Sequence, residues 1–324
     1  MELLERLPGH RVVVVGDVML DEYLLGSVKR VSPEAPVLVV DVERMTWAPG
    51  GAANVAANIR ALGGEVSLVG LVGKDHASER LRGLLEEMGV LTDGLIEDSK
   101  RDTSLKTRII AGHQQVVRVD REQREKPEGA SLRKLKDKIA EKLEESEAIV
   151  VSDYDKGVIG QATLDAVRMT RQSGKFFSSN PKPQNLRWFH GAHLLTLNQV
   201  EAEAASGETI DSEKAVQKAG KKILERTDAD WVIITRGANG LDILGKDGQS
   251  SRVPGMPVEV FDVAGAGDTV VSALTLAMAA GSDIGTAARL ANYAAATVVR
   301  KLGVASAVPS EVAHLIKETE QGTE

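Results

Sequence analysis

Cysteine is absent from the 324 residues of this chain, which excludes a disulfide framework and thiolate metal sites. The sequence also lacks any run of roughly 18 apolar residues, the length that a helix needs to span a bilayer. Its first residues, Met1-Glu-Leu-Leu-Glu-Arg-Leu-Pro8, carry acids and lack the basic start and apolar run of a signal peptide. These absences predict a cytoplasmic protein with no membrane partner.

An excess of positive charge is also missing, because the formal net charge is −7. A nucleic-acid partner is therefore not expected, since broad nucleic-acid binding requires a basic surface. A phosphorylated small molecule would still need a local basic patch. The apolar fraction of 42% and the charged fraction of 27% are typical of a soluble globular protein.

Short apolar runs alternate with amphipathic stretches along the chain, a pattern typical of a parallel sheet covered by helices on both faces. The expected strands are 11–16, 66–72, 148–151, 175–177, 193–197 and 231–235. The expected helices are 51–62, 76–88, 131–147 and 270–280. We predict an α/β fold, a three-layer sandwich with a mostly parallel, doubly wound sheet.

Two segments, 23–45 and 103–121, break this rhythm with alternating apolar and polar residues and many β-branched positions. We expect antiparallel excursions that form a minor β subdomain, or lid, beside the main sheet. No linker rich in Pro, Gly or Ser and no internal repeat divides the chain. Residues 1–320 are therefore predicted to form a single domain.

Polar clusters follow several of the expected strands. They are Ser152–Gly157, Asn180–Lys182, Asn198–Glu201 and Arg236–Gly237. In open parallel sheets, ligands bind outside the carboxyl ends of the strands. Each cluster alone is equally compatible with ordinary loop chemistry, but clusters at equivalent places favour a binding site.

The segment Asp262-Val-Ala-Gly265-Ala266-Gly267-Asp268 directly precedes an apolar helical run. Glycines let the backbone approach a ligand, and the N–H groups at a helix start stabilise an anion. An aspartate placed there would repel a phosphate that was merely bound. It is useful if it accepts the proton of an attacking hydroxyl while the N–H groups neutralise a transferring phosphoryl group. The alternative is an N-capping aspartate on a glycine turn.

Two other segments at strand ends carry candidate ligand residues. Asn198 and Glu201 could hold Mg²⁺ through water, although the same spacing is common in helix capping. Thr235, Gly237 and Gly240 place a hydroxyl and two glycines at a strand end, which suits nucleotide phosphates or a plain turn. The nearby run from Gly240 to Asp247 only mimics a P-loop, because Asp247 stands where Ser or Thr belongs, so we expect a hairpin turn.

Near the N-terminus, Asp17 and Asp21 follow the first strand, and Gly51 and Asn54 open the first helix of the sheet. Carboxylates and an amide suit the hydroxyls of a polyol, because each takes a specific donor or acceptor role. Turn and cap chemistry is the alternative here as well.

Together these motifs resemble the ribokinase family of carbohydrate kinases, in the same order and over nearly the whole chain. The resemblance implies Asp268 as the catalytic base and Gly265 to Gly267 as an anion hole. It also implies an ATP site shaped by Thr235, Gly237 and Asn292, with Mg²⁺ and, at Asp262, a candidate K⁺ site. The family usually has Thr at the position of Ala264, whose hydroxyl is missing here.

Longer strings resemble the heptose 7-phosphate kinases within that family. They are residues 14–23, 30–37, 49–55, 103–108, 114–120 and 152–157. The departures are Asn180 in place of the usual Asp, and Leu197 in place of the usual Pro. Many relatives also carry a fused nucleotidyltransferase. Because this chain ends at Glu324, we expect that activity to belong to another protein where the pathway is present.

The resemblance implies phosphorylation of the anomeric hydroxyl of D-glycero-D-manno-heptose 7-phosphate to the 1,7-bisphosphate, a precursor of ADP-heptose and lipopolysaccharide. The sugar phosphate would need cationic ligands. The candidates are Lys106, Arg108, Arg118, Lys156 and Lys182. One alternative is a kinase for ribose, fructose or adenosine, and another is a binding regulator without catalysis. A homodimer through the β-branched lid segments is expected.

Overall fold

The computed structural model describes residues 1–112, 114–172 and 174–321. Its main sheet has the strand order β13-β12-β11-β10-β9-β8-β1-β4-β5. The strands are β1 (Arg11–Gly16), β4 (Glu65–Val72), β5 (Leu91–Glu97), β8 (Ala148–Ser152), β9 (Phe176–Asn180), β10 (Leu194–Asn198), β11 (Trp231–Thr235), β12 (Leu241–Gly245) and β13 (Ser250–Val253). Within this order, the neighbouring strands β11, β10, β9, β8, β1, β4 and β5 all pair in parallel. Strands β12 and β13 are antiparallel additions at the β11 edge.

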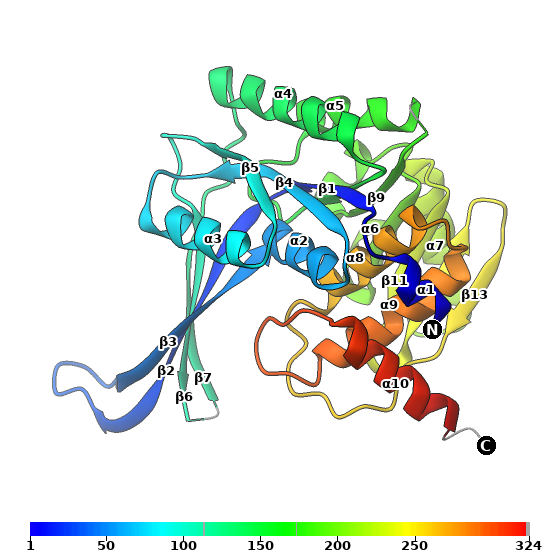
Figure 1. The fold of residues 1–324 in the computed structure, drawn as a ribbon. Coiled ribbons are helices and arrows are strands. Elements are labelled where there is room, and N and C mark those ends of the chain that lie inside the picture. The colour runs from blue at the N-terminus through cyan, green and yellow to red at the C-terminus, as the bar shows by residue number, and fades with distance from the viewer. Residues whose placement is uncertain (113, 173, 322–324) are drawn as a thin grey trace.

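Helices cover both faces of this sheet, which confirms the predicted three-layer α/β fold (Figure 1). One layer contains α1 (Glu2–Arg6), α2 (Ala52–Ala61), α3 (His76–Glu87), α8 (Ala266–Ala279), α9 (Ile284–Val298) and α10 (Pro309–Gln321). The other contains α4 (Gly129–Glu145), α5 (Gln161–Gln172), α6 (Gln199–Ser206) and α7 (Glu213–Thr227). The short 3₁₀ helices are η1 (Pro183–Trp188) and η2 (Gly237–Asn239).

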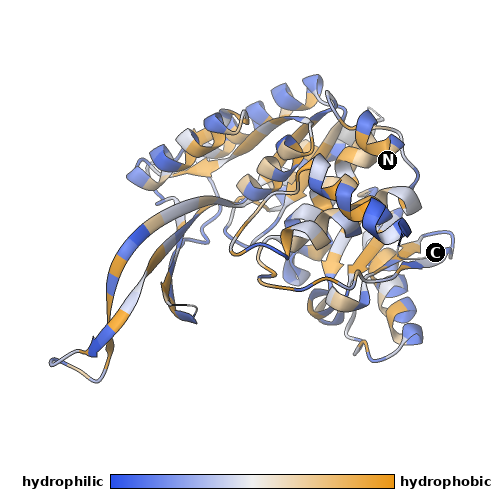
Figure 2. Ribbon diagram, turned by 60° about the horizontal axis from the view of Figure 1, so that its bottom comes forward, coloured by the Kyte–Doolittle hydropathy of each residue, from blue (hydrophilic) through white to orange (hydrophobic). Residues whose placement is uncertain are grey.

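Strand β1 shows why the fold has two cores. Val12 and Val14 pack into the layer with α2 and α8, and Val13 and Val15 pack into the opposite layer. Successive side chains of a strand point to opposite faces, so a continuous valine run supplies both cores at once. Figure 2 shows the result, with hydrophobic strands enclosed between helices whose outer faces are hydrophilic.

A second, four-stranded sheet extends away from the main body, with the order β3-β2-β6-β7 (Figure 1). It comprises β2 (Val18–Val31), β3 (Leu38–Gly51), β6 (Ser104–Ala111) and β7 (Gln114–Arg121). We call it the projecting sheet. It contains the two segments expected to form a minor sheet, but the expected pairing is only partly right. The hairpins β2–β3 and β6–β7 are antiparallel, whereas β2 and β6 pair in parallel.

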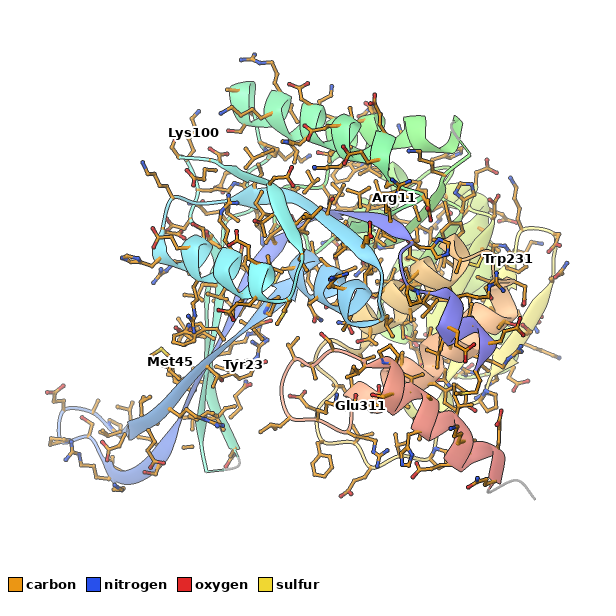
Figure 3. All side chains as sticks on the ribbon, viewed as in Figure 1. Arg11, Tyr23, Met45, Lys100, Trp231 and Glu311 are labelled. Atoms are coloured by element: carbon orange, nitrogen blue, oxygen red, sulfur yellow. The ribbon has the colours of Figure 1, made fainter. Side chains whose placement is uncertain are left out.

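The two faces of the projecting sheet differ in what they meet. Figure 3 shows Tyr23 on the side that faces the main body and Met45 on the opposite side. The Tyr23 hydroxyl accepts a hydrogen bond of 3.3 Å from the backbone N–H of Val304. We call the side that carries Tyr23 the inner face.

Local signals in the sequence mark the ends of several elements. Asp75 caps α3 by accepting the backbone N–H of Ser78 at 2.9 Å, and Gly89 follows that helix with a φ of 76°. The run from Gly240 to Asp247 lies in the β12–β13 hairpin, as expected, and is no P-loop. Within the described chain, no helix is both long and apolar enough to cross a membrane.

Candidate active site

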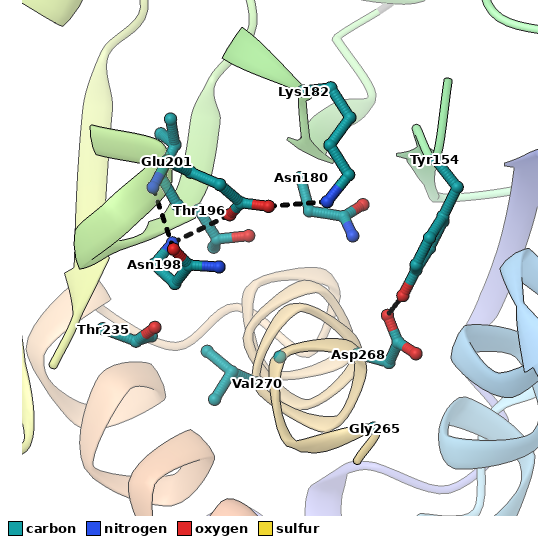
Figure 4. A pocket seen from close by; sticks show the side chains of 12 residues that line it. Tyr154, Asn180, Lys182, Thr196, Asn198, Glu201, Thr235, Gly265, Asp268 and Val270 are labelled. Carbon is teal, nitrogen blue, oxygen red and sulfur yellow. Dashed lines mark hydrogen bonds and ion pairs between the residues drawn. The ribbon is translucent and has the colours of Figure 1, made fainter. Parts of the chain in front are cut away.

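The polar clusters that follow β8, β9, β10 and β11 meet at one edge of the sheet, opposite the start of α8. A cavity opens there, and the residues that line it include Tyr154, Lys182, Asn198, Glu201, Thr235 and Asp268 (Figure 4). The parallel strands place their carboxyl ends side by side, so segments far apart in the chain converge.

Helix α8 begins at this cavity with the sequence Gly265-Ala266-Gly267-Asp268. Gly265 has a φ of 80°, and a Cβ at its position would lie 2.8 Å from the side-chain nitrogen of Asn54. A larger residue would thus be strained and would collide with a neighbour. In the described chain, no side chain caps this helix start. The Ala266 N–H donates to the Val263 carbonyl at 3.3 Å, and the N–H groups that follow it at the helix start can interact with an anion in the cavity.

Asp268 is 5% exposed, and both its carboxylate oxygens accept hydrogen bonds. The Tyr154 hydroxyl donates to Oδ1 at 2.5 Å, and Asn54 Nδ2 donates to Oδ2 at 2.8 Å. Burial raises the pKa of Asp268 to about 6, and the charge of Asp21 adds to the rise. The two hydrogen bonds and the Lys182 ammonium oppose this effect. Asp268 is therefore a carboxylate that can take up a proton near neutral pH.

Tyr154 belongs to a loop that Asp17 holds in place. The Asp17 carboxylate accepts the backbone N–H groups of Tyr154, Lys156 and Val158 at 2.8, 3.1 and 3.0 Å. Asp17 was predicted to bind sugar hydroxyls, but in this structure it is 1% exposed and directed to these amides. Burial is the main reason why its pKa is raised.

Asp153 fixes the same loop to the segment after β9. Its carboxylate accepts the backbone N–H groups of Asp155 and Lys182, each at 2.9 Å, and the Asn185 amide at 3.0 and 3.1 Å. Burial raises the pKa of Asp153 to about 6. Sequence reasoning assigned no role to Tyr154, Asp153 or Asn185. The polar cluster Ser152–Gly157 was the signal that could have pointed to the first two.

On the other side of the cavity, Asn198 and Glu201 form a reciprocal capping box at the start of α6. Glu201 Oε2 accepts the Asn198 N–H at 3.0 Å, and Asn198 Oδ1 accepts the Glu201 N–H at 2.9 Å. Glu201 Oε1 also accepts a hydrogen bond of 2.6 Å from Lys182 Nζ. The two residues therefore cap the helix, which was the alternative to magnesium binding. Glu201 also lines the cavity.

A magnesium ion fits this part of the cavity. The donors are one carboxylate, on Glu201, and one amide oxygen, on Asn198. Across the described residues, no cluster of three or more His, Cys, Asp or Glu could hold a metal. Such a sparse donor set suits Mg²⁺, which keeps several waters and is often held mainly by nucleotide phosphates.

The predicted nucleotide residues separate into two groups. Thr235 lines the cavity, and Gly237 has a φ of 54° with open space at its Cβ position. Gly240 instead packs against the chain, because a Cβ there would lie 2.1 Å from the carbonyl oxygen of Val253. Asn292, on α9, donates its amide to the Pro254 carbonyl at 2.9 Å. Neither Gly240 nor Asn292 lines the cavity around Asp268.

A second cavity lies between the inner face of the projecting sheet and the loops that contain Asp262 and Gly303. Its lining includes Tyr23, Arg44 and Arg108. Asp262, the candidate cation ligand, joins the two loops by accepting the N–H groups of Ala264 and Gly303 at 2.9 and 3.0 Å.

The predicted sugar residues Asp21, Gly51 and Asn54 are not among the residues that line the two cavities, but Asp21 and Asn54 bind residues that are. Asp21 is buried and binds the Arg108 guanidinium, and its charge acts on Asp268. Gly51 starts α2 with a φ of 56°, and a Cβ there would lie 2.5 Å from the Asp17 carbonyl oxygen. Asn54 engages its amide with Asp268 and its oxygen with Asn58 Nδ2, at 3.1 Å.

Three of the other predicted cations, Lys106, Arg118 and Lys156, are joined in one ion-pair network through Asp120 and Glu122. Lys106 Nζ lies 3.1 Å from Asp120 and 3.2 Å from Glu122, and Lys156 Nζ lies 2.6 Å from Glu122. Arg118 makes two hydrogen bonds to Asp120, at 2.8 and 3.0 Å. Each of these side chains therefore has an acidic partner, and their role as ligands of a sugar phosphate stays a prediction.

Comparisons with known proteins agree with this architecture. The model of the pfkB family carbohydrate kinases matches residues 10–311. Bifunctional protein HldE from Citrifermentans bemidjiense is 43% identical over 309 residues, which cover 95% of this chain and 63% of that protein. The chain thus spans less than two thirds of the length of this relative.

Solved structures show the same fold at low identity. Phosphofructokinase-2 from Escherichia coli in complex with potassium has a TM-score of 0.80 and 20% identity, covering 96% of this chain and 99% of that one. Arabidopsis thaliana ribokinase complexed with ribose and ATP has a TM-score of 0.77 and 19% identity, covering 95% and 99%. The fold is therefore ribokinase-like. From the family match and the identity to its relative, the chain belongs to the pfkB family of carbohydrate kinases.

Proposed function

We propose that this sugar kinase transfers the γ-phosphoryl group of ATP to the anomeric hydroxyl of D-glycero-D-manno-heptose 7-phosphate and releases the 1,7-bisphosphate and ADP. The heptose phosphate is supported by the motifs shared with heptose 7-phosphate kinases and by the 43% identity to Bifunctional protein HldE. The observation that carries the reaction type is the buried Asp268 carboxylate beside the start of α8, which has no side-chain cap. A reaction that consumes ATP is expected in the cytoplasm.

In the proposed reaction, an Asp268 oxygen accepts the proton of the sugar hydroxyl as the sugar oxygen attacks the γ-phosphorus. The bond between that phosphorus and the β–γ bridging oxygen breaks, and the negative charge passes to ADP. The N–H groups of Gly265 to Gly267 would stabilise the charge on the transferring group. A carboxyl with a pKa of about 6 suits this role, because a general base works best when its pKa lies near the working pH.

ATP is proposed to lie between Thr235 and the start of α8, with its phosphates directed at the helix N–H groups. Mg²⁺ would be held through water by Glu201 and, on the nucleotide side, by the phosphates. Lys182 would lie close enough to contribute positive charge, since it borders the same cavity. A K⁺ ion near Asp262 is proposed by analogy with the potassium complex of phosphofructokinase-2.

For the 7-phosphate, we propose the inner face of the projecting sheet. Arg108 on β6 lies directly opposite Arg118 on β7, and each guanidinium is paired with a carboxylate, Arg108 with Asp21 and Arg118 with Asp120. A phosphate bound between the two guanidinium groups would share these cations with the carboxylates or take the place of one of them. Arg44, which lines the same cavity as Arg108, would add a third cation. Arginine is suited to this task because its planar guanidinium binds phosphate through two hydrogen bonds.

We further propose a homodimer formed through the projecting sheet. Several apolar side chains of this sheet and of the β2–β3 connection are exposed, namely Val28, Val31, Val37, Leu38, Val42, Met45, Val116, Val117 and Val119. Exposed apolar patches of this kind mark interaction surfaces. A mass measurement by light scattering tests the dimer, and replacing Val31 and Val42 with Thr should convert it to a monomer. A monomeric parent would contradict the proposal.

The substrate is tested by measuring ADP release with heptose 7-phosphate, heptose, ribose, fructose and adenosine side by side. Heptose 7-phosphate should give the highest kcat/KM, and ³¹P NMR of the product should show a new anomeric phosphate beside the 7-phosphate. Turnover of only an unphosphorylated sugar or nucleoside would replace the heptose phosphate assignment. Binding of sugar and ATP without any turnover would instead favour a regulator.

A further inference from the structure

The hydrogen bond between Tyr154 and Asp268 joins the loop after β8 to the start of α8. Tyr154 Oη lies 2.5 Å from Asp268 Oδ1, and both side chains line the same cavity (Figure 4). We propose that Tyr154 is a positioning residue, whose hydroxyl fixes the orientation of the Asp268 carboxylate and favours its ionised form. The inference rests on the proposed function, because it takes Asp268 as the base.

Tyr154 is held in place before any ligand binds. Its backbone N–H donates to Asp17 Oδ2 at 2.8 Å, and Asp17 also binds two further N–H groups of the same loop. Lys182 Nζ lies 5.2 Å from the centroid of the Tyr154 ring, within the range of a cation–π interaction. The hydroxyl is therefore presented to Asp268 by a rigid support, as positioning a catalytic group requires.

The phenol can act only as a donor toward the carboxylate. Burial raises the pKa of Tyr154 well above its usual value, and the negative charge of Asp268 adds to the rise. Tyr154 thus keeps its proton throughout the pH range in which the enzyme would work. Oδ2 of Asp268 is held by Asn54, so the two donors together define the plane of the carboxylate.

The groups that face Asp268 come from several elements and act in opposite directions. Burial and Asp21, from β2, favour the protonated form of Asp268. Tyr154, Asn54 from α2 and Lys182 from the segment after β9 favour the ionised form. These opposing effects leave the pKa of Asp268 at about 6, close to neutral pH. Loss of one strong donor would therefore leave much of the base protonated at neutral pH.

The first test compares the pH profile of kcat/KM for the parent and Tyr154→Phe, with whichever sugar the substrate screen identifies. This profile reports the pKa of the base in the free enzyme. A hydrogen bond to a charged group typically shifts a pKa by about one to two units, so the acid limb should move up by that amount. Tyr293→Phe, on α9 and outside the cavity, is the matched control and should leave the limb unchanged. An acid limb that stays in place in Tyr154→Phe would overturn the inference.

The second test does not depend on turnover. The Asp268 carboxyl is titrated by ¹³C NMR in ligand-free protein, and Asp268→Asn identifies its signal. Its pKa should rise in Tyr154→Phe, and thermal melting checks that this variant is folded. An unchanged pKa in a folded variant refutes the role of Tyr154. If no sugar is phosphorylated by the parent, the proposed function fails, whereas the titration still decides whether Tyr154 controls Asp268.

Discussion

The ammonium nitrogen of Lys182 lies 2.6 Å from the carboxylate oxygen Oε1 of Glu201 and 5.2 Å from the ring centroid of Tyr154, between the two side chains (Figure 4). The other oxygen of Glu201 accepts the N–H of Asn198 at 3.0 Å. Glu201 is therefore oriented by the helix start and neutralised by a lysine. A magnesium ion with its nucleotide phosphates would offer both side chains a new partner of opposite charge.

Glu201→Gln tests this arrangement. Glutamine keeps the capping geometry, because it also accepts the Asn198 N–H, but it removes the negative charge. The Mg²⁺ concentration for half-maximal activity should rise about 10-fold or more, since outer-shell partners of a metal typically contribute on the order of 10–100-fold in affinity. Titrating activity with Mg²⁺ at fixed ATP measures this. An unchanged Mg²⁺ requirement would show that Glu201 serves only as a cap.

Arg108→Gln and Arg118→Gln test the proposed site for the sugar phosphate. Each should raise KM for heptose 7-phosphate while KM for ATP stays nearly constant, because the guanidinium groups lie on the projecting sheet, away from Thr235. Losing a charge-assisted hydrogen bond typically costs about 1.5–3 kcal/mol, or roughly 10- to 100-fold in KM.

The matched control for these arginines is Arg121→Gln. Arg121 is on the same strand as Arg118 but lines a groove on the opposite face of the projecting sheet, with Trp47 and Arg80. Its loss should leave KM for the sugar phosphate unchanged. Equal effects of the two substitutions on β7 would argue that the sheet contributes general charge and no specific site.

Asp268→Asn should abolish most of the turnover while ATP still binds. The amide cannot accept the proton of the sugar hydroxyl, and general base catalysis contributes about 10²–10⁴-fold. Single-turnover kinetics measures the rate, and calorimetry measures nucleotide affinity. A variant that stays nearly as fast as the parent would remove Asp268 from the mechanism.

The same substitution should stabilise the fold at alkaline pH. Asp268 has a folded-state pKa of about 6, raised from 3.8, so between these values the folded protein binds more protons than the unfolded chain. The stability associated with the neutral carboxyl is therefore present below pH 4 and is lost as the pH rises to 6. The full difference is about 3 kcal/mol.

An asparagine in that place carries no charge at any pH and can still pair with Tyr154 and Asn54. Thermal melting at pH 8 should therefore show Asp268→Asn as more stable than the parent, with the gap closing toward pH 4. If the parent is at least as stable as the variant at pH 8, burial of the ionised Asp268 carboxylate does not destabilise the folded protein, and the prediction is wrong.

Asp268 and the glycines before it could be predicted from the sequence because a helix start is a local feature with a strong residue signal. The contact from Asn54 to Asp268 could not, because it joins residues 214 positions apart and depends on how α2 and α8 pack. Tyr154 escaped notice for the same reason. Its neighbours in the chain are polar, and only the fold brings its hydroxyl to the base.

The contacts of the basic residues could not be predicted from the sequence for a different reason. The alternation in 103–121 indicated a strand, but the register of β6 against β7 decides which cations meet. Register placed Arg108 opposite Arg118 and Lys106 opposite Asp120. A slip of one residue would have sent each side chain to the other face, and no local signal fixes that choice.

Gly240→Ala distinguishes a structural glycine from one that binds nucleotide. Gly240 and Gly248 have φ values of 84° and 88°, so alanine is strained at both, and Gly240 also has a ψ of −139°, a combination that is close to exclusive to glycine. Only at Gly240 would the new Cβ lie 2.1 Å from a backbone oxygen, whereas at Gly248 nothing lies within 4 Å. Gly240→Ala should therefore lower the melting temperature well beyond Gly248→Ala, and ATP affinity measured below that temperature should be unchanged in both. A loss of ATP affinity without a loss of stability would restore Gly240 to the nucleotide site.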